Sequence, residues 1–196
     1  MCSSMQNSKF IVIALSLILF SSSFPLHDVY ATDGSSITRA MVTTSENGLN
    51  SLEHDTTYAS RNSLVQVDSD TYALAYMGDG SDGYISTFTI SADGATVTEV
   101  ATLEHDTTLS QYNSLVQVDS DTYALAYSGD GGDGFISTFT ISADGTTVTK
   151  VATLEHDTAR GQDNSLVQVD SDTYALAYAG DDYDGFITTF TIHADG

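Results

Sequence analysis

The chain of 196 residues is poor in basic side chains. It has five Lys and Arg against 27 Asp and Glu, which gives a formal net charge of −22. An acidic surface of this kind repels the phosphates of nucleic acids and the headgroups of anionic lipids. The composition therefore argues against nucleic acid as a partner. It fits either cation-rich surroundings or a surface that binds calcium, and charge alone does not separate the two.

Cysteine and proline are nearly absent, and tryptophan is absent altogether. Cys2 and Pro25 both lie in a leader in which Lys9 precedes an eleven-residue apolar run over 10–20. This run is shorter than the ~20 residues that a membrane-spanning helix needs. Small residues at 29 and 31 fit a cleavage site, so residues 1–31 are interpreted as a signal peptide and the protein as secreted or cell-surface.

Removal of that leader leaves no thiol in the chain. This excludes disulfides, cysteine nucleophiles, thiolate metal sites and thiol redox chemistry. The sequence also contains no nucleophile-elbow, metalloprotease, P-loop or dinucleotide-binding motif. We therefore expect a protein that is not an enzyme.

Beyond residue 51 the sequence is a tandem repeat with a period of 51 residues. Repeat 1 spans 52–102, repeat 2 spans 103–153 and repeat 3 spans 154–196, where it ends before its last strand. The first two copies differ at nine positions only. Such a repeat predicts three copies of one structural unit.

Each unit carries the signals of four antiparallel strands, and no window has a helical period. In repeat 1 the strands are expected at 64–67, 71–76, 84–90 and 96–103, with turns at Asp68-Ser69-Asp70 and at Asp93-Gly94. Within 71–76, large Tyr and Leu side chains alternate with alanines, so that both faces of the sheet are apolar. A sheet with two apolar faces packs between two neighbours, as in an all-β propeller.

The unit resembles kelch-like β-propeller repeats in its period, in the tyrosine-rich strand at 71–76 and in the glycine-rich loop at 78–83. The resemblance covers 52–196 and concerns the architecture, because the kelch double glycine is split here by Asp79, Asp130 and Asp181 and the tryptophan is missing. It implies blades of four antiparallel strands.

The number of blades is low for a closed propeller, which typically has four to eight. A lead-in at 32–51 includes Ile37-Thr38-Arg39, which matches the outer strand of an earlier, partial blade. With about three blades, we expect an incomplete propeller. Either the chain is a fragment of a longer array, or several chains form a homo-oligomer that closes the ring.

The glycine-rich loops supply carboxylates that suit calcium, a cation that prefers oxygen ligands from flexible loops. Each copy holds two Asp residues with the spacing D-x-x-D, and the alternative is a solvated turn. As Ca²⁺ ligands the sequence offers Asp79, Asp82, Asp130, Asp133, Asp181 and Asp184.

Glu53, His54 and Asp55, which recur in every copy, are a weaker metal candidate. Strand alternation would point Glu53 and Asp55 to one face and His54 to the other, and one imidazole per unit makes a poor zinc site. The alternative is a strand end followed by a turn in which Asp55 bonds the local backbone.

The copies differ most just before the strand at 64–67 and in the glycine-rich loop, which the strand order of a blade places on one face. A uniform scaffold with a variable face is how repeat proteins present a binding surface, although neutral drift in loops is an equal alternative. The ligand-binding face is expected to comprise Tyr58, Arg61, Leu109, Tyr112, Arg160 and Asp163.

We therefore expect a secreted, acidic, repeat β-propeller that acts as a non-catalytic binding or adhesion module for an extracellular protein or glycan. The first alternative is a calcium-stabilised structural repeat of a cell-surface layer. The second is a fragment of a propeller hydrolase.

Overall fold

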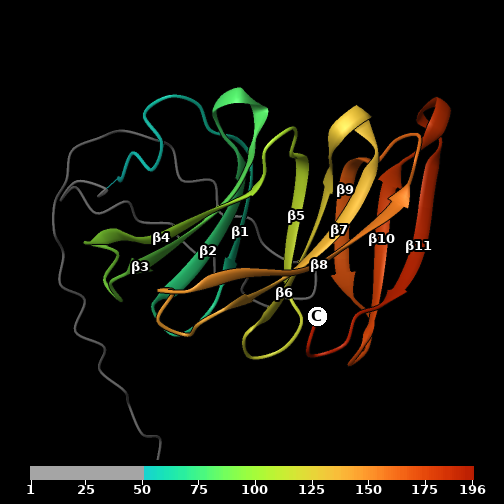
Figure 1. Cartoon of the computed structure of the whole chain (residues 1–196). Helices are drawn as coiled ribbons and strands as arrows, with labels where there is room; N and C mark the ends of the chain where they lie inside the picture. The colour runs from blue at the N-terminus through green and yellow to red at the C-terminus, as the bar shows by residue number, and fades with distance from the viewer. Residues whose placement is uncertain (1–50) are drawn as a thin grey trace, which may run out of the picture. The chain divides into compact units, whose positions relative to one another are not determined.

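The computed structural model describes residues 51–196, and every strand pair in this range is antiparallel (Figure 1). The predicted signal peptide at 1–31 and the predicted outer strand around Ile37 lie outside the described residues. Within 51–196, no helix is long and apolar enough to cross a membrane.

The three copies fold alike, with three short 3₁₀ turns (η) in the glycine-rich loops. The first copy supplies β1 Ser60–Gln66, β2 Thr71–Met77, η1 Asp79–Ser81, β3 Gly83–Ile90 and β4 Val97–Asp106. The second supplies β5 Gln111–Gln117, β6 Thr122–Ser128, η2 Asp130–Gly132, β7 Gly134–Ile141 and β8 Val148–Asp157. The third supplies β9 Gln162–Gln168, β10 Thr173–Ala179, η3 Asp181–Tyr183 and β11 Gly185–Thr191.

These strands form three separate sheets, none of which is closed: sheet 1 is β1-β2-β3-β4, sheet 2 is β5-β6-β7-β8 and sheet 3 is β9-β10-β11. This is an all-β, incomplete propeller-like repeat fold. The sheets are offset from the sequence repeats, because β4 continues through Leu103 to Asp106 and so takes the first four residues of repeat 2.

All four strands of the first copy are longer than predicted, and bulges explain the two largest differences. β1 begins at Ser60 rather than at Leu64, with a register shift between Ser60 and Ser63. β4 ends at Asp106 rather than at Leu103, with a register shift where it leaves Gly83. A bulge interrupts the alternation of apolar and polar residues, so the sequence pattern stops before the strand does.

Each sheet has one face built around alanines and one face built around tyrosines. We name the alanine face by Val67, Ala73, Ala75 and Ile85 of sheet 1 and their equivalents, and the tyrosine face by Leu115, Tyr123, Leu125, Tyr127 and Phe139 of sheet 2 and their equivalents. The alanine face of sheet 1 packs on the tyrosine face of sheet 2 in one buried cluster. The alanine face of sheet 2 packs on the tyrosine face of sheet 3 in the same way.

Hydrogen bonds recur between the sheets as well. The backbone N–H of Leu115 donates to Ser63 Oγ at 2.9 Å, and that of Leu166 donates to Ser114 Oγ at 3.0 Å. A third hydrogen bond joins sheet 1 to sheet 2: Thr87 Oγ1 donates to the carbonyl oxygen of Gly145 at 2.7 Å. The chain thus shows the same sheet-to-sheet interface twice.

Candidate functional site

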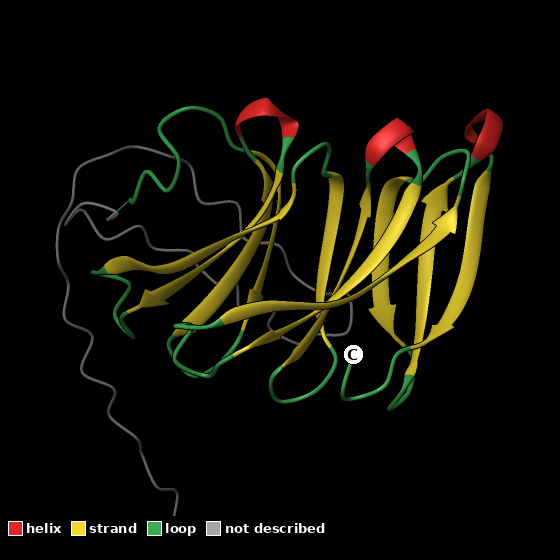
Figure 2. Cartoon of the chain, in the orientation of Figure 1, coloured by secondary structure: helices red, strands yellow, loops and turns green. Residues whose placement is uncertain are grey.

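Strand register brings three kinds of segment to the same end of the sheets: the start of the inner strand, the loop with the 3₁₀ turn, and the end of the outer strand. Ser60 at the start of β1 pairs with Met77 at the end of β2, and Gly83 at the start of β3 pairs with Asp106 at the end of β4. The three 3₁₀ turns follow one another along this edge (Figure 2). We call this end of the sheets the variable edge. It comprises residues 58–61 and 79–83 and their equivalents in the other copies.

All six residues predicted to contact a ligand lie at the variable edge. Tyr58 and Arg61 are exposed, as is Asp163, whereas Leu109 and Tyr112 are half-buried. Arg160 is half-buried too, and its backbone N–H donates to Asp157 Oδ1 at 3.1 Å. The edge therefore mixes exposed side chains with others that are partly held by their neighbours.

The backbone at this edge adopts left-handed conformations at the positions where the copies differ. The extra residue of each inner-strand bulge has a positive φ: 58° at Arg61, 54° at Tyr112 and 52° at Asp163. The second variable position, in the 3₁₀ turn, has φ of 76° at Ser81 and 64° at Tyr183. Such values are unfavourable for most residues other than glycine, asparagine and aspartate.

Variable residues also contact one another. The Arg61 guanidinium of sheet 1 lies 4.4 Å from the centroid of the Tyr112 ring of sheet 2. The Arg160 guanidinium lies 3.8 Å from the ring centroid of Tyr183. Tyr183 was not among the predicted contact residues, although its difference from Ser81 and Gly132 marked the position as variable.

The six predicted calcium ligands lie in or beside the 3₁₀ turns. In the first turn, Ser81 N–H donates to the carbonyl of Gly78 at 3.2 Å, and Gly78 N–H donates to the carbonyl of Asp82 at 2.9 Å. These carbonyl oxygens therefore close the turn itself. Among residues 51–196, no three His, Cys, Asp or Glu side chains converge as a metal site would require. Calcium binding by paired Asp residues stays a prediction.

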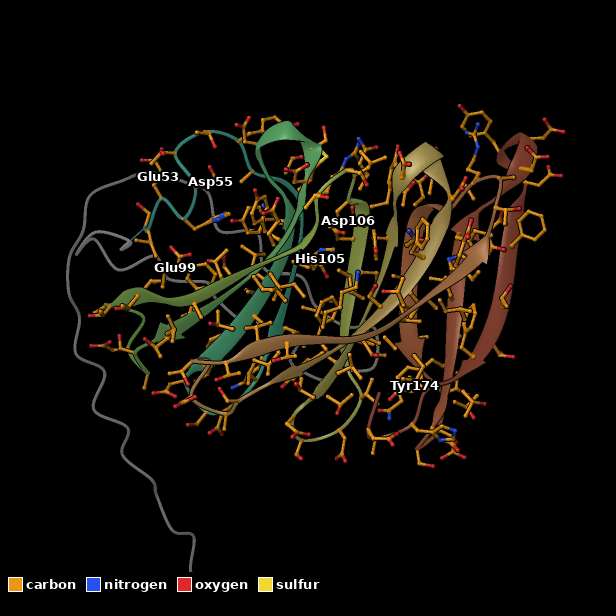
Figure 3. All side chains as sticks on the ribbon, viewed as in Figure 1. Glu53, Asp55, Glu99, His105, Asp106 and Tyr174 are labelled. Atoms are coloured by element: carbon orange, nitrogen blue, oxygen red, sulfur yellow. The ribbon has the colours of Figure 1, made fainter. Side chains whose placement is uncertain are left out.

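The recurring Glu-His-Asp segment joins consecutive sheets. Gly83 pairs with Asp106 and Tyr84 pairs with Glu104, so His105 is the extra residue of a bulge in β4. Strict alternation, on which the prediction for this segment rested, therefore does not hold here. Figure 3 labels His105 and Asp106 at this end of β4.

The His105 ring fills the space between the two sheets. It packs edge-on against Tyr127 and Phe139 of sheet 2, with centroid distances of 5.2 and 5.5 Å. On its other side it covers Gly83, where an added Cβ would lie 2.6 Å from the ring. Burial, reinforced by the charge of Lys150, lowers the pKa of His105 to about 4. The ring is therefore neutral at physiological pH.

The carboxylate of Asp106 holds the connection that follows. Its Oδ1 accepts hydrogen bonds from the backbone N–H and the hydroxyl of Thr108 at 3.0 and 2.7 Å, and its Oδ2 accepts one from Tyr127 at 3.1 Å. Burial alone would raise the pKa of Asp106, but these hydrogen bonds lower it. Asp55 accepts from Thr57 in the same way. These contacts match the turn-forming alternative for the segment.

A cavity of about 230 Å³ lies between sheets 2 and 3. It is lined mainly by apolar and threonine side chains, among them Ile136, Leu154 and Phe190. None of the residues predicted to bind a ligand or calcium lines it. The variable edge therefore remains the candidate site.

Comparison with known protein families and with curated proteins finds no match to this chain.

Proposed function

We propose that this chain is a non-catalytic binding or adhesion module, secreted or displayed at the cell surface, which contacts an extracellular protein or glycan through the variable edge. The proposal depends chiefly on one observation: in all three copies, the residue that varies most at the bulge is the residue with a positive φ.

Neutral drift would favour glycine, asparagine or aspartate at such a position, because other side chains cost roughly 1–2 kcal/mol there. Two of the three copies instead carry Arg61 and Tyr112, and the third carries Asp163. Backbone strain of this kind is concentrated at functional sites, and bulges re-aim side chains beside them. The backbone conformation is the same in all three copies, whereas the side chain that it presents differs, and this combination supports a role in recognition.

The chemistry at the edge also supports a binding role. Exposed tyrosines at 58 and 183 offer flat apolar rings that can stack on a sugar or pack on a protein surface. Arg160, whose guanidinium lies over the ring of Tyr183, places positive charge beside Asp181 and Asp182 of a strongly acidic chain. Rings, guanidinium groups and carboxylates together supply stacking, donors and acceptors on a rigid sheet scaffold.

The test measures binding of the purified chain to isolated cell-envelope material. Replacing Arg61, Tyr112 and Arg160 together with Ala should abolish binding without unfolding the protein. Protease digestion or periodate oxidation of the envelope material beforehand then distinguishes a protein ligand from a glycan ligand.

The matched control replaces Ser69, Ser120 and Ser171 with Ala, because these exposed residues lie in turns at the opposite edge. We expect this triple variant to bind like the wild type. If the variable-edge variant still bound at full strength, the proposal would be wrong.

A further inference from the structure

Repeats 1 and 2 contain six Asp-Gly pairs, and this dipeptide can react with itself. Glycine has no Cβ, so its backbone nitrogen can approach the carboxyl carbon of the aspartate before it. In a folded chain the reaction depends on how firmly hydrogen bonds and packing hold the two groups. The pairs are made of the same two residues, so the structure decides which of them react.

Two of the pairs lie in the 3₁₀ turns of the variable edge, Asp79-Gly80 in η1 and Asp130-Gly131 in η2. The aspartate and the glycine of both pairs are exposed. Within residues 51–196, neither carboxylate accepts a hydrogen bond and neither glycine N–H donates one. Nothing in this part of the chain therefore holds the reacting groups apart.

The pair in the turn before β4, Asp93-Gly94, is equally exposed, yet hydrogen bonds hold both of its reacting groups. Asp93 Oδ1 accepts from Ser91 Oγ at 2.7 Å and from the Ala95 N–H at 3.0 Å. The Gly94 N–H donates to the carbonyl oxygen of Ser91 at 2.7 Å. The bonds from Ala95 and Ser91 lower the pKa of Asp93, and an ionised carboxylate resists attack by a nucleophile.

The equivalent pair before β8, Asp144-Gly145, is held by equivalent bonds. Asp144 Oδ1 accepts from Ser142 Oγ at 2.7 Å and from the Thr146 N–H at 3.1 Å. The Gly145 N–H donates to the carbonyl oxygen of Ser142 at 2.8 Å. Both turns before the outer strands thus protect their Asp-Gly pair.

The third kind of pair is protected by packing. Gly83, which follows Asp82, is buried in β3 beneath the ring of His105. Gly134 is buried beneath the ring of His156 in the same way. A buried strand residue cannot turn its nitrogen towards the preceding carboxyl group without breaking this contact.

We infer that Asp79 and Asp130 are sites of spontaneous isomerisation to isoaspartate. The glycine nitrogen loses its proton and attacks Cγ of the protonated carboxyl group, a C–N bond forms, and one water molecule leaves, which gives a cyclic succinimide. Water then adds to one of the two ring carbonyl carbons and breaks its bond to nitrogen. Opening at the former main-chain carbonyl gives isoaspartate, and opening at the other restores aspartate, so water is the only reactant.

The product alters the variable edge, because the main chain then runs through the former side-chain carboxyl group and is one carbon longer. The carbonyl oxygen of Asp79, which accepts from the Asp82 N–H at 3.2 Å, becomes part of a free carboxylate. The same turn is joined to the next copy by the Ser110 N–H, which donates to the carbonyl oxygen of Ser81 at 3.1 Å. The reaction needs no ligand and does not depend on the proposed binding role.

The test incubates the purified chain at neutral pH in water enriched in heavy oxygen and maps its peptides by mass. Each ring opening transfers one heavy oxygen to the product, and a protease that cleaves before aspartate leaves isoaspartate uncut. Asp79 and Asp130 should react about tenfold faster than Asp93 and Asp144, because the latter must first break their hydrogen bonds. Equal rates at these positions in the folded chain would overturn the proposal.

The chain unfolded in urea is the first control. Its hydrogen bonds are lost, so all of these pairs should react at similar rates. A difference that persisted in urea would come from the local sequence, and the proposal would be wrong. It would also be wrong if the unfolded chain reacted while the folded chain formed no product at Asp79 and Asp130.

Matched variants then test the cause of the difference. Ser91→Ala removes the hydroxyl that donates to Asp93, so Asp93 should react several-fold faster while Asp144 keeps its rate. Asp79→Glu should end the reaction at that position, because a larger ring would have to form, and should leave Asp130 unchanged. Circular dichroism checks that both variants fold. An unchanged rate at Asp93 in Ser91→Ala would mean that hydrogen bonds do not protect it, which would overturn the proposal.

Discussion

Sheets 1 and 3 are built from almost the same sequence, yet they differ in what their alanine faces contact. In sheet 1 this face is covered by the tyrosines and leucines of sheet 2, and Ile85 is fully buried. In sheet 3 the same face is open and Ile187 is mostly exposed. Strands of nearly the same sequence can therefore differ strongly in burial, because a propeller-type sheet is completed by its neighbour rather than by its own residues.

The largest expected difference is between Ile85→Ala and Ile187→Ala. Removing the buried side chain leaves a cavity and should lower the free energy of unfolding by about 2–5 kcal/mol. At the exposed position the loss should be about 0.5 kcal/mol or less. Urea unfolding measures both, and equal losses would contradict the comparison.

Lowering the pH should destabilise the packing between sheets 1 and 2 through protonation of His105. Its pKa is about 4 in the folded chain and about 6.5 in the unfolded chain, so the unfolded state binds more protons between these values. Stability should therefore be complete above about pH 6.5 and fall by up to about 3 kcal/mol as the pH drops towards 4.

Replacing His105 with Gln should flatten this pH dependence, measured as the unfolding midpoint in urea at successive pH values. His193→Gln is the control, because that side chain is exposed. A wild-type slope in the His105 variant would show that the acid sensitivity has another origin.

The next largest effect on stability is expected for substitutions of the glycines that the histidine rings cover. At Gly134 an added Cβ would lie 2.5 Å from the His156 ring, so Gly134→Ala should cost about 1–3 kcal/mol through overpacking. Gly185→Ala has free space around it and should change the thermal midpoint of the monomer little. If both variants melted alike, the histidine would not be held against the glycine.

The serine that links two sheets should have a smaller effect. Ser63→Ala removes the acceptor of the Leu115 N–H and should cost about 1 kcal/mol. Ser165→Ala changes the equivalent residue on the open face of sheet 3 and should be close to neutral. Denaturant midpoints compare the pair directly, with a neutral Ser63→Ala as the contrary outcome.

Calcium bound by the Asp pairs should have the smallest effect on stability. A site whose Kd equals the calcium concentration stabilises the fold by only about 0.4 kcal/mol. Thermal melts in calcium and in chelator test this. Because the third loop holds an additional carboxylate at Asp182, replacing that residue with Ser should reduce any shift more than changing Ser81 to Ala.

Much of the fold could be predicted from sequence. The 51-residue period predicted the repeated sheets, and the alternation of tyrosines with Ala73 and Ala75 predicted two apolar faces, both of which are confirmed. The strand ends were missed, because the bulges at Arg61 and His105 break the period-two pattern. Nothing in the local sequence announces that a histidine will cover a glycine of the strand beside it.

The same contrast holds for the variable edge: its positions could be predicted from the sequence, but its backbone conformation and contacts could not. Differences among copies indicated the positions at 58–61 and in the glycine-rich loop, because substitutions are visible without a structure. The positive φ of the bulge residues and the stacking of Arg61 on Tyr112 were not accessible, since the first depends on the register of β1 against β2 and the second on a contact between two sheets.

By itself the sequence determined the repeating unit, its strand composition and the two apolar faces, because hydrophobic alternation and turn residues act over short stretches of chain. Only the tertiary structure decided which face is covered, which histidine is neutral and which glycine a histidine ring covers. These properties belong to pairs of sheets, and identical residues differ in them according to whether a neighbouring sheet is present.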